Sequence, residues 1–419
     1  MKQVAPAPPC EEKGDDLPMM KLGKRTFLGV PRSVEELSAE WLTSALRYKR
    51  LLQDDVHIIS VEYKAIGDGA IGEVYAVSFT FSGPTTSPAT LVAKFSPRGK
   101  APLPSFVIRS IFKAEAHFYN DFSPATGGLC RPTCYLALYN PRRWKPTFCI
   151  LLEDLQPKAS FTRIGGDNPQ VGILLSYMRG IARLHARWWA HPKAPPLDWV
   201  LHPAKDFGGL ALRVFMRTAK LGLPALVKCF PAVCQLLLSW MPVLRKRHRF
   251  IVQECFRPPL TLTHGDAHIE NAFFDERWKP DGVVFIDFGN MMFSPGVSDV
   301  AFFLLHSLGI EVRRKLEEQL LAHYHSCLIT FGVDERSYPY AQCWRDYRFN
   351  MWRGLLSLCA MAPGLRKRMM KKTIGDDEMH LYEELCRRCI TAMQDQCWLD
   401  LVQEGDEGCG PCSGISCCY

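Results

Sequence analysis

Two short acidic motifs, joined by a predicted β-hairpin, constrain the fold of this 419-residue chain more than any other feature. The first motif, H-G-D-x-x-x-x-N, contains Asp266 and Asn271 and follows an apolar strand. The second motif, D-F-G, begins at Asp287 and ends the returning strand after a turn at residues 280–282. Phosphoryl transfer uses an aspartate beside the attacking hydroxyl and oxygen ligands that hold Mg²⁺ against the phosphates. The motifs therefore predict that Asp266 is a catalytic base and that Asn271 and Asp287 bind Mg²⁺.

Three glycines upstream, Gly67, Gly69 and Gly72, have the spacing G-x-G-x-x-G. That spacing occurs in dinucleotide-binding turns that open a helix, in kinase loops that cover phosphates from a β-hairpin, and in plain surface turns. In residues 74–81, Tyr75, Val77, Phe79 and Phe81 fall on one face at a period of two, which indicates a strand, and residues 89–95 form a second short strand. This hairpin pattern excludes the dinucleotide-binding turn.

A lysine and a glutamate distinguish a kinase loop from a plain surface turn. Lys94 lies in the strand LVAKF at residues 91–95, where a kinase places its phosphate-binding lysine. Glu115 falls within the apolar stripe of a helix predicted over residues 106–122. A carboxylate on an apolar face is costly unless it is paired. We therefore expect Glu115 to pair with Lys94, and we interpret the three glycines as a phosphate-covering loop.

Hydrophobic periodicity divides the chain into a small β-rich part and a larger, mostly helical part. This outline predicts an α+β, protein-kinase-like fold with two lobes. A capping box from Ser33 to Glu36 predicts the start of the first helix. We expect four segments along the chain: a disordered, proline- and charge-rich extension at 1–27, an N-terminal lobe at 28–155, a C-terminal lobe at 156–402, and a disordered, cysteine-rich tail at 403–419.

Composition gives expectations about location and partners. The net charge of +8 is compatible with a nucleotide but too diffuse to predict nucleic-acid binding. The chain opens without an apolar signal segment, so we expect a cytoplasmic protein whose 17 cysteines are reduced. Residues 221–244 are apolar enough to span a membrane, but Lys228 and three prolines argue against a transmembrane helix. Cys417 and Cys418 raise lipid anchoring as an alternative to a plain disordered tail.

Several further residues have both a structural and a functional interpretation. The segment LLEDL, with Glu153 and Leu155, either presents its backbone to an adenine base or forms a surface turn. His185 lies on an apolar helix stripe, which favours a hydrogen-bonded core histidine over a catalytic one. Asp299 either caps a helix or bonds the loop that contains Asp266. An aromatic run is favoured as helix core over a substrate pocket: Trp344, Tyr347, Phe349 and Trp352.

Taken together, the motifs resemble the aminoglycoside phosphotransferase and choline kinase superfamily, and most nearly its ecdysteroid kinase-like family. The resemblance runs from about residue 28 to residue 400 and rests on six segments: EAHFY at 115–119, LLEDL at 151–155, ARLHARWW at 182–189, HGDAHIEN at 264–271, IDFGN at 286–290 and SDVAFFL at 298–304. It implies a two-lobed fold, ATP and Mg²⁺, and phosphorylation of a hydroxyl group on a small molecule. Residue by residue, it assigns these roles: the base to Asp266, metal ligation to Asn271 and Asp287, phosphate binding to Lys94 with Glu115, and bracing of the catalytic loop to Asp299.

One position departs from this family pattern, and two other classes of protein compete with it. Gly289 stands after Asp287-Phe288, where many relatives carry a polar residue. This difference does not change the predicted metal ligand, Asp287. A protein kinase is excluded, because the chain passes from D-F-G to Asp299 without an activation segment or an A-P-E motif. A non-catalytic nucleotide-binding scaffold is disfavoured, because the lysine, the base and the metal aspartate are all present.

The substrate is only weakly constrained by the sequence. Basic runs at residues 245–247 and 366–368 argue against polycationic aminoglycosides and favour a neutral, apolar alcohol such as a sterol-like compound. Choline requires an aromatic cage, which the tryptophans could supply.

Overall fold

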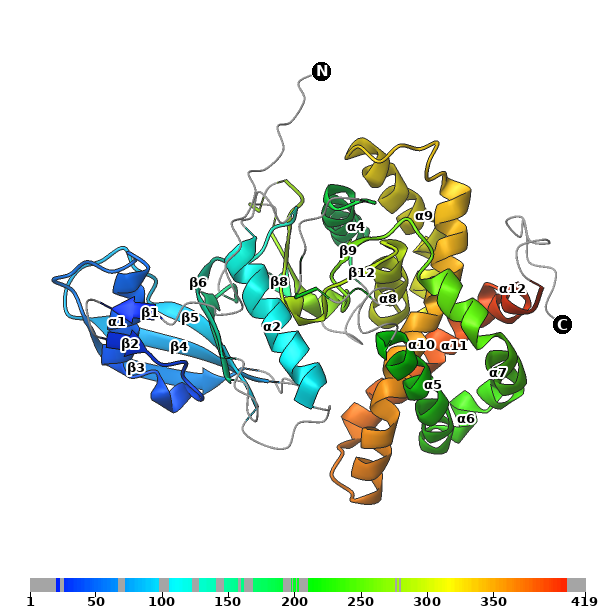
Figure 1. The fold of residues 1–419 in the computed structure, drawn as a ribbon, viewed down its shortest axis with the longest axis horizontal. Coiled ribbons are helices and arrows are strands. Elements are labelled where there is room, and N and C mark those ends of the chain that lie inside the picture. Colours follow the sequence, from blue (N-terminus) through cyan, green and yellow to red (C-terminus); the bar gives the residue numbers. More distant parts are fainter. Residues whose placement is uncertain are drawn as a thin grey trace. The chain divides into compact units, whose positions relative to one another are not determined.

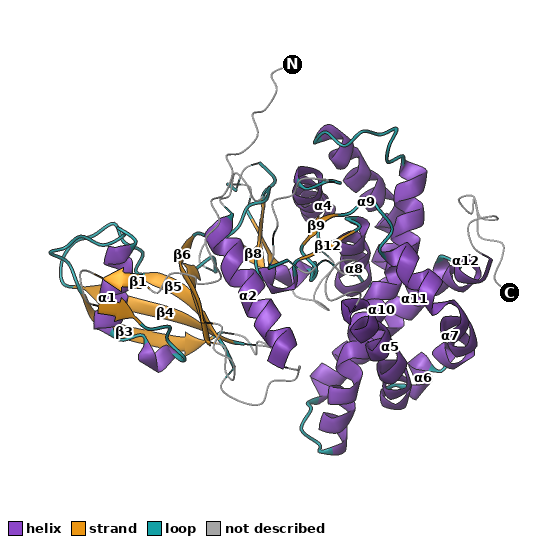
Figure 2. Ribbon diagram, viewed as in Figure 1, coloured by secondary structure: helices purple, strands orange, loops and turns teal. Residues whose placement is uncertain are grey.

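The computed structural model describes most of the chain, and the described residues fall into two compact units. Unit 1 lies within residues 1–123, 132–157 and 192–199, and unit 2 within residues 124–131, 158–191 and 200–419. The described residues are 20–22, 26–66, 72–97, 105–122, 128–140, 147–156, 160–161, 169–190, 197, 199–200, 202, 210–275, 277–278 and 280–404. A sheet dominates unit 1 and helices dominate unit 2 (Figures 1 and 2), which confirms the predicted α+β class.

Unit 1 is built on a five-stranded antiparallel sheet with the strand order β3-β4-β5-β7-β6. Its strands are β3 (Ile58–Ala65), β4 (Glu73–Phe81), β5 (Thr90–Phe95), β6 (Cys134–Asn140) and β7 (Thr147–Glu153). One face carries alternate apolar side chains, such as Val77 and Leu91, and packs against helix α1 (Ala39–Tyr48) in a hydrophobic core. Helix α2 (Ser105–Asp121) packs against β6 and β7. Because side chains alternate along a strand, Lys94 lies on the face opposite this core.

The first helix begins later than the sequence pattern predicts. Ser33 makes no side-chain cap, and a single 3-10 turn follows it. The Glu36 carboxylate accepts from the Arg32 N–H at 3.0 Å, and Ser38 caps α1 by accepting from the Trp41 N–H at 3.1 Å. Both Ser33 and Ser38 are residues that can cap a helix. The helix begins after Ser38, because this start buries the apolar side of α1 against the sheet.

A short hairpin occupies part of the segment that the sequence predicts to be disordered. Strands β1 (Met20–Leu22) and β2 (Thr26–Leu28) pair in antiparallel fashion. The structure thus pairs residues 20–22 with 26–28 inside the segment expected to be disordered, and the extent of that extension stays a prediction. Residues 1–19 lie outside the described part of the chain.

Unit 2 is mainly helical. Its helices are α4 (Val171–Arg187), α5 (Leu210–Cys229), α6 (Pro231–Cys234), α7 (Leu236–Cys255), α8 (Val297–Ser307), α9 (Ile310–Thr330), α10 (Tyr340–Met370), α11 (Asp376–Asp395) and α12 (Trp398–Glu404). Its short strands are β8 (Ser160–Phe161), β9 (Thr261–Thr263), β10 (Ala272–Phe274), β11 (Val283–Phe285) and β12 (Met292–Ser294). They form a three-stranded sheet, β11-β10-β8, and a separate pair, β12-β9. The predicted hairpin between the acidic motifs is β10-β11.

The apolar segment 221–244 is divided among three helices of unit 2. Pro231 begins the short helix α6, whereas Pro224 and Pro242 lie inside α5 and α7. The chain therefore breaks at Pro231 and not at every proline. Within the described residues, no helix combines the length and the apolar character needed to cross a membrane. The tail from residue 405 onward, including Cys417 and Cys418, lies outside this description.

Helices α5 and α10 contact each other backbone to backbone at Gly222, and this contact generates a prediction. A Cβ atom at Gly222 would lie 1.9 Å from the Cys359 carbonyl oxygen. Gly222→Ala should therefore lower the free energy of unfolding by about 1–3 kcal/mol, because the two helices must separate. Urea unfolding followed by circular dichroism measures this loss.

Gly364→Ala is the matched control for that substitution. Gly364 also lies in a helix, α10, but no atom lies within 4 Å of an added Cβ. This variant should be stabilised by about 0.5–1 kcal/mol through helix propensity. Equal stabilities of the two variants would contradict the close contact at Gly222.

Candidate active site

The segment that contains the first acidic motif, residues 264–271, is held in place by short buried strands of unit 2; we call it the aspartate loop. It leaves the buried strand β9, passes through one 3-10 turn and enters β10. Strand β12 pairs with β9, and β11 pairs with β10, so the start of the loop is tied to the strand after the second motif and its end to the strand before that motif. The local sequence explains this arrangement, because each strand is a three-residue apolar or β-branched run.

Asp299 anchors the beginning of the aspartate loop. Its carboxylate accepts from the His264 N–H at 2.7 Å and from the Gly265 N–H at 3.0 Å. His185 Nε2 lies 3.1 Å from the same carboxylate, and His185 Nδ1 lies 2.8 Å from the Tyr324 hydroxyl. Burial alone raises the pKa of Asp299, but the hydrogen bond and charge of His185, together with nearby His264 and Arg353, hold that pKa below its usual value. Asp299 therefore bonds the loop, and His185 is a hydrogen-bonded core residue, as predicted.

Three contacts connect the aspartate loop to the segment around the second motif. His264 Nε2 lies 2.9 Å from the Ile286 carbonyl oxygen, and the Ile286 N–H donates to the Asn271 carbonyl at 3.0 Å. Gly265 has φ of +81°, and a Cβ there would lie 1.9 Å from the Asn290 carbonyl oxygen. Only glycine fits this position, because the left-handed conformation and the close backbone both exclude a side chain.

Asp266 is partly exposed at the turn of the aspartate loop. Its side chain is 29% exposed, and Asn290 Nδ2 donates to Oδ2 at 3.3 Å. Burial raises the pKa of Asp266, the Asp287 carboxylate raises it further, and His268, His264 and the Asn290 amide oppose the shift. Asp287 follows Ile286, whose N–H bonds Asn271, and Asn271 in turn bonds the Asp266 carbonyl, so the two predicted site carboxylates belong to neighbouring segments. A carboxylate that is raised in pKa and still accessible suits a general base.

Asn271 and Asp287 have the features expected of Mg²⁺ ligands. Asn271 is buried, and its Nδ2 donates to the Asp266 carbonyl at 2.8 Å, so the amide nitrogen is fixed in the loop. Asp287 has φ of 66° and ψ of 71°, a left-handed conformation that is uncommon for non-glycine residues and is tolerated best by aspartate and asparagine. One carboxylate and one amide oxygen suit Mg²⁺, which prefers oxygen ligands and shares them with water and phosphate. The described residues contain no group of three His, Cys, Asp or Glu side chains able to hold a metal ion, so a closed structural metal centre is absent from them.

The ion pair predicted in unit 1 is present. Lys94 Nζ lies 2.5 Å from Glu115 Oε1, which joins the middle of the sheet to helix α2. Glu115 is 2% exposed and Lys94 is 17% exposed, so the pair is largely removed from water. The apolar surroundings of Glu115 on α2 explain this burial, since Ala114, Ala116 and Phe118 are buried beside it.

Only one of the three predicted loop glycines lies within the described part of the chain. Gly72 precedes β4, and a Cβ there would lie 2.7 Å from the Phe95 carbonyl oxygen on β5. A larger residue at Gly72 would therefore separate the two strands. Gly67 and Gly69 lie outside the described residues.

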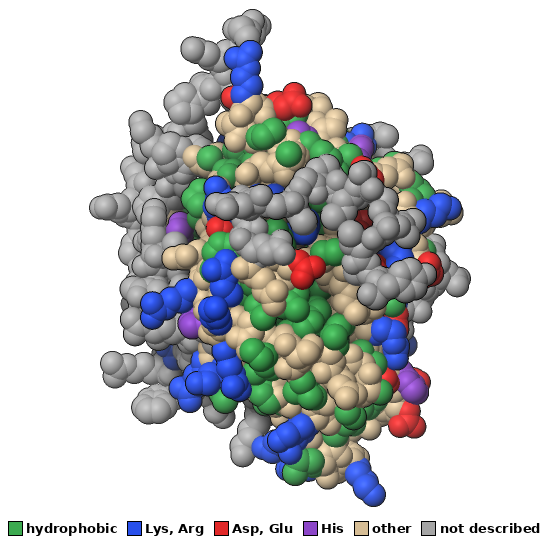
Figure 3. Space-filling model, turned by 90° about the vertical axis from the view of Figure 1, so that its right-hand side faces the viewer, with side chains coloured by type: hydrophobic (Ala, Val, Ile, Leu, Met, Phe, Trp, Pro, Cys, Tyr) green, Lys and Arg blue, Asp and Glu red, His purple; other side chains and the backbone are tan. Residues whose placement is uncertain are grey.

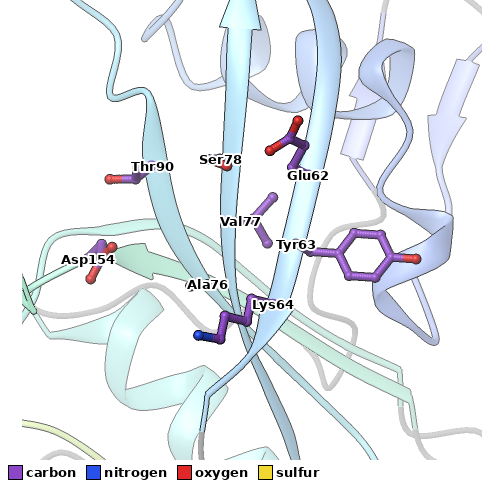
Figure 4. A pocket seen from close by; sticks show the side chains of 8 residues that line it. All are labelled: Glu62, Tyr63, Lys64, Ala76, Val77, Ser78, Thr90 and Asp154. Carbon is purple, nitrogen blue, oxygen red and sulfur yellow. The ribbon is translucent and has the colours of Figure 1, made fainter.

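A polar pocket of about 190 Å³ lies in unit 1 on the sheet face that carries Lys94. Strand register places alternate residues of β3, β4 and β5 on that face: Glu62, Lys64, Ala76, Ser78, Thr90 and Lys94. All of these except Lys94 line the pocket, and Asp154 lines it from the segment after β7. Figure 4 shows Tyr63 pointing away from Thr90 and Asp154, as the alternation of β3 requires. The pocket therefore lies on the same face of the sheet as Lys94, toward the end of β4 and β5 that is far from Gly72.

The segment LLEDL passes the same end of the sheet. The Glu153 carboxylate accepts from the Thr133 N–H at 3.1 Å, and the Glu153 N–H donates to the Thr133 carbonyl at 2.8 Å. The Glu153 side chain therefore fastens β7 to the segment before β6. Leu155 is buried, and Asp154 Oδ1 accepts from the Gln156 N–H at 3.1 Å. The segment is a fixed turn beside the pocket.

Sequence reasoning missed two polar residues near Asp266. Asn290 bonds the Asp266 carboxylate, and His268 Nε2 lies 3.1 Å from Asn271 Nδ2. Both belong to the quoted motifs, but only their positions in space distinguish them from neighbouring polar residues. The aromatic run is helix core, as favoured, because Tyr347 and Trp352 are buried and Trp352 stacks on Trp398.

Comparison with known proteins supports this description. The sequence model of the ecdysteroid kinase-like family matches residues 232–332, which include both acidic motifs. An ethanolamine kinase from Plasmodium vivax superposes with a TM-score of 0.50 at 13% identity, covering 85% of this chain and 89% of that one. A choline kinase from Cryptosporidium parvum has a TM-score of 0.49 at 10% identity, with 88% and 97% covered. An aminoglycoside 2′-phosphotransferase in complex with GDP has a TM-score of 0.49 at 16% identity, with 83% and 99% covered.

The fold shared with the ethanolamine kinase is protein-kinase-like, which confirms the predicted fold class. Within that class, the findings confirm the resemblance to the aminoglycoside phosphotransferase and choline kinase-like superfamily, with the ecdysteroid kinase-like family matched over the acidic motifs. No curated protein sequence matches the chain significantly.

The anchoring role of Asp299 generates a prediction. Asp299→Asn replaces one acceptor oxygen by a donor, so a buried N–H group of the aspartate loop loses its partner. The variant should lose about 1–3 kcal/mol of unfolding free energy at pH 7. Because the pKa of Asp299 is lowered in the folded protein, the stabilisation is present above the ordinary value of about 4 and is lost below it. The difference between variant and wild type should therefore shrink in thermal melts below about pH 4.

Glu318→Gln is the control for this measurement. Glu318 is an exposed carboxylate on α9, and its neutralisation should change stability by less than about 0.5 kcal/mol. If Asp299→Asn left the free energy of unfolding unchanged, the aspartate loop would be held by its strands alone.

Proposed function

We propose that the protein is an ATP- and Mg²⁺-dependent phosphotransferase that phosphorylates a hydroxyl group of a small molecule. The observation that carries this proposal is the braced aspartate loop, in which Asp266 is partly exposed and the oxygen-bearing side chains of Asn271 and Asp287 belong to the same and the neighbouring segment. The family match over residues 232–332 supports the same reaction class. A non-catalytic scaffold would not require Asp266 to keep an accessible carboxylate beside two metal-type ligands.

In this proposal Asp266 takes the proton of the substrate hydroxyl as the alcohol oxygen attacks the terminal phosphorus. A new O–P bond forms, the bond to the nucleoside diphosphate breaks, and the proton passes to the Asp266 carboxylate. Asn290 holds that carboxylate in position through its Oδ2 atom. Asp266 must be ionised to act, so activity should fall as the pH drops through its raised pKa.

Asn271 and Asp287 would hold Mg²⁺, and this metal, when bound, would neutralise phosphate charge during transfer. The Asn271 amide is oriented for ligation because its nitrogen is fixed to the Asp266 carbonyl. The Ile286 N–H bond to Asn271 keeps the ends of the two motifs together. These contacts would hold the two ligand groups in position.

The nucleotide would lie against the Lys94 face of the sheet in unit 1. Lys94 would bind phosphate, and Glu115 would hold the lysine in place. The glycine loop, with Gly67, Gly69 and Gly72, would cover the phosphates. The adenine ring of the nucleotide would lie at the turn after β7, where the Glu153 carbonyl and the Leu155 N–H are the expected backbone contacts.

We further propose a neutral, apolar alcohol, such as a sterol-like compound, as the substrate class. The match to the ecdysteroid kinase-like family supports a steroid-type acceptor. Burial of Trp352 in a stack with Trp398 removes one tryptophan from any aromatic cage for choline. The purified protein, given labelled ATP and a metabolite extract, should transfer label to an apolar alcohol. Labelling of choline, ethanolamine or an aminoglycoside instead would overturn this substrate class.

The test of the reaction is a pair of aspartate substitutions. Asp266→Asn should reduce kcat by about 10²–10⁴-fold, because the base is lost, while nucleotide binding changes little. Asp287→Asn should also abolish the Mg²⁺-dependent stabilisation by ATP in a thermal melt, because a metal ligand is lost. Turnover assays and melts with and without Mg²⁺ measure both effects.

The two substitutions separate the alternatives. A protein that binds Mg²⁺ and ATP but transfers no phosphate to any extract component would be a scaffold. Asp266→Asn turnover within about threefold of wild type would remove the base from Asp266.

The Lys94–Glu115 pair generates a separate prediction. Lys94→Met and Glu115→Gln should each lower kcat/KM for ATP, because each variant breaks the ion pair of 2.5 Å. The double variant should be little worse than the worse single variant, since paired residues are non-additive. A steady-state kinetic double-mutant cycle measures the coupling. Fully additive losses in kcat/KM would mean that the two residues act separately. A Glu115→Leu variant that is more stable than wild type and still active would show that position 115 prefers an apolar side chain.

A further inference from the structure

Helices α5, α7 and the last turns of α10 expose hydrophobic side chains on the surface of unit 2. The described chain exposes eight large hydrophobic side chains, and half of them lie on these three helices: Leu221, Leu238, Met361 and Met370. Contacts at Gly222–Cys359 and Cys229–Ala362 pack α5 along α10, and α7 packs against both. The exposed side chains therefore lie on three helices that pack together, and we call the outer side of these helices the α5–α7–α10 surface.

An apolar groove of about 360 Å³ lies between α5 and α7 on this surface. It is lined by Leu223, Pro224, Val227, Leu238, Met241 and Pro242, with Arg245 as its charged member. Leu238 is 53% exposed and Pro224 and Pro242 are exposed, so the groove is open and its apolar lining is available to a partner. Isolated exposed hydrophobic residues are normal, but a groove of them marks an interaction site.

The chain segments that form this surface are rich in basic residues. Residues 217–249 contain seven Lys and Arg and no Asp or Glu, and residues 361–372 contain five and none. Most of these basic side chains are exposed: Arg217, Lys220, Lys228, Arg245, Lys246, Arg249, Arg366, Lys367, Arg368, Lys371 and Lys372. Glu378 neutralises one of them through its ion pair with Arg368. Figure 3, which views the side on which α7 and α12 lie in Figure 1, shows hydrophobic side chains exposed among Lys and Arg side chains.

We propose that the α5–α7–α10 surface docks on an anionic phospholipid bilayer. Surface helices that combine exposed apolar side chains with lysine and arginine lie in the plane of the membrane interface, where acyl chains and anionic headgroups satisfy both kinds of group. In this arrangement the groove between α5 and α7 takes an acyl chain, and Arg245 pairs with a phosphate. The contact is peripheral, which agrees with the lack of a membrane-crossing helix in the described residues.

The chemistry of the surface favours a bilayer over a soluble polyanion. A polyanion needs only the positive charges, whereas Leu221, Leu238, Met361 and Met370 gain nothing from it. Each basic residue near an anionic membrane contributes an attraction that falls within a Debye length, so binding should weaken with salt. The exposed apolar side chains supply the remaining, salt-resistant part of the attraction.

Vesicle sedimentation tests this proposal with the full-length protein. Wild type should sediment with phosphatidylcholine vesicles that contain phosphatidylserine, less with pure phosphatidylcholine, and less again as salt is raised. Arg245→Glu with Lys246→Glu should lower the partition coefficient for phosphatidylserine vesicles at least about tenfold, because two attractions become repulsions. Leu238→Gln should lower it several-fold and leave binding to soluble heparin unchanged, because it removes apolar area without changing charge.

The matched control is Lys315→Glu with Arg336→Glu, which makes the same change in net charge at exposed residues of α9 and the segment after it. This variant should bind vesicles nearly as well as wild type. Three results would overturn the proposal: failure of wild type to bind either vesicle, equal losses in both double variants, or an unchanged Leu238→Gln variant. Phosphotransfer does not enter these measurements, so they are independent of the proposed function.

Discussion

The carboxylate of Asp299 is the contact on which the candidate active site depends. It accepts hydrogen bonds from two consecutive N–H groups, those of His264 and Gly265, immediately before Asp266. Its own position is held by His185, which Tyr324 bonds in turn. A buried charge persists only when its hydrogen bonds are complete, so this chain of contacts determines where the aspartate loop can lie. Asp266 is accessible because the residues before it are fully anchored.

The rest of the site in unit 2 follows from that anchor. Once His264 and Gly265 are fixed, the hairpin β10-β11 returns Asp287 toward Asp266, and the Ile286 N–H bond to Asn271 closes the arrangement. The strain at Asp287 is the local cost of this closure. Two carboxylates and one amide thereby meet in one place, although they come from the two ends of a hairpin.

Much of the fold and of the site could be predicted because the relevant signals are local. Alternation along residues 74–81, the apolar stripe around Glu115 and the spacing of the acidic motifs each depend on a few neighbouring residues. The Lys94–Glu115 pair was predictable for the same reason, since an isolated carboxylate on an apolar helix face needs a cation. The start of the first helix was not predictable, because Ser33 and Ser38 are both good caps and only packing of α1 on the sheet chooses between them.

The sequence by itself determined the fold class, the residue types of the site and their order, because periodicity and motif spacing are local properties of the chain. The tertiary structure alone decided which polar neighbours act on Asp266, since the selection of Asn290 requires the β9-β12 and β10-β11 pairings to be formed. It also decided that the basic runs 245–247 and 366–368 lie on helices that pack together, with Arg245 of the first run lining the apolar groove. These runs are far apart in sequence, and only the packing of α5, α7 and α10 brings them to one surface, where charge and exposed apolar area act together.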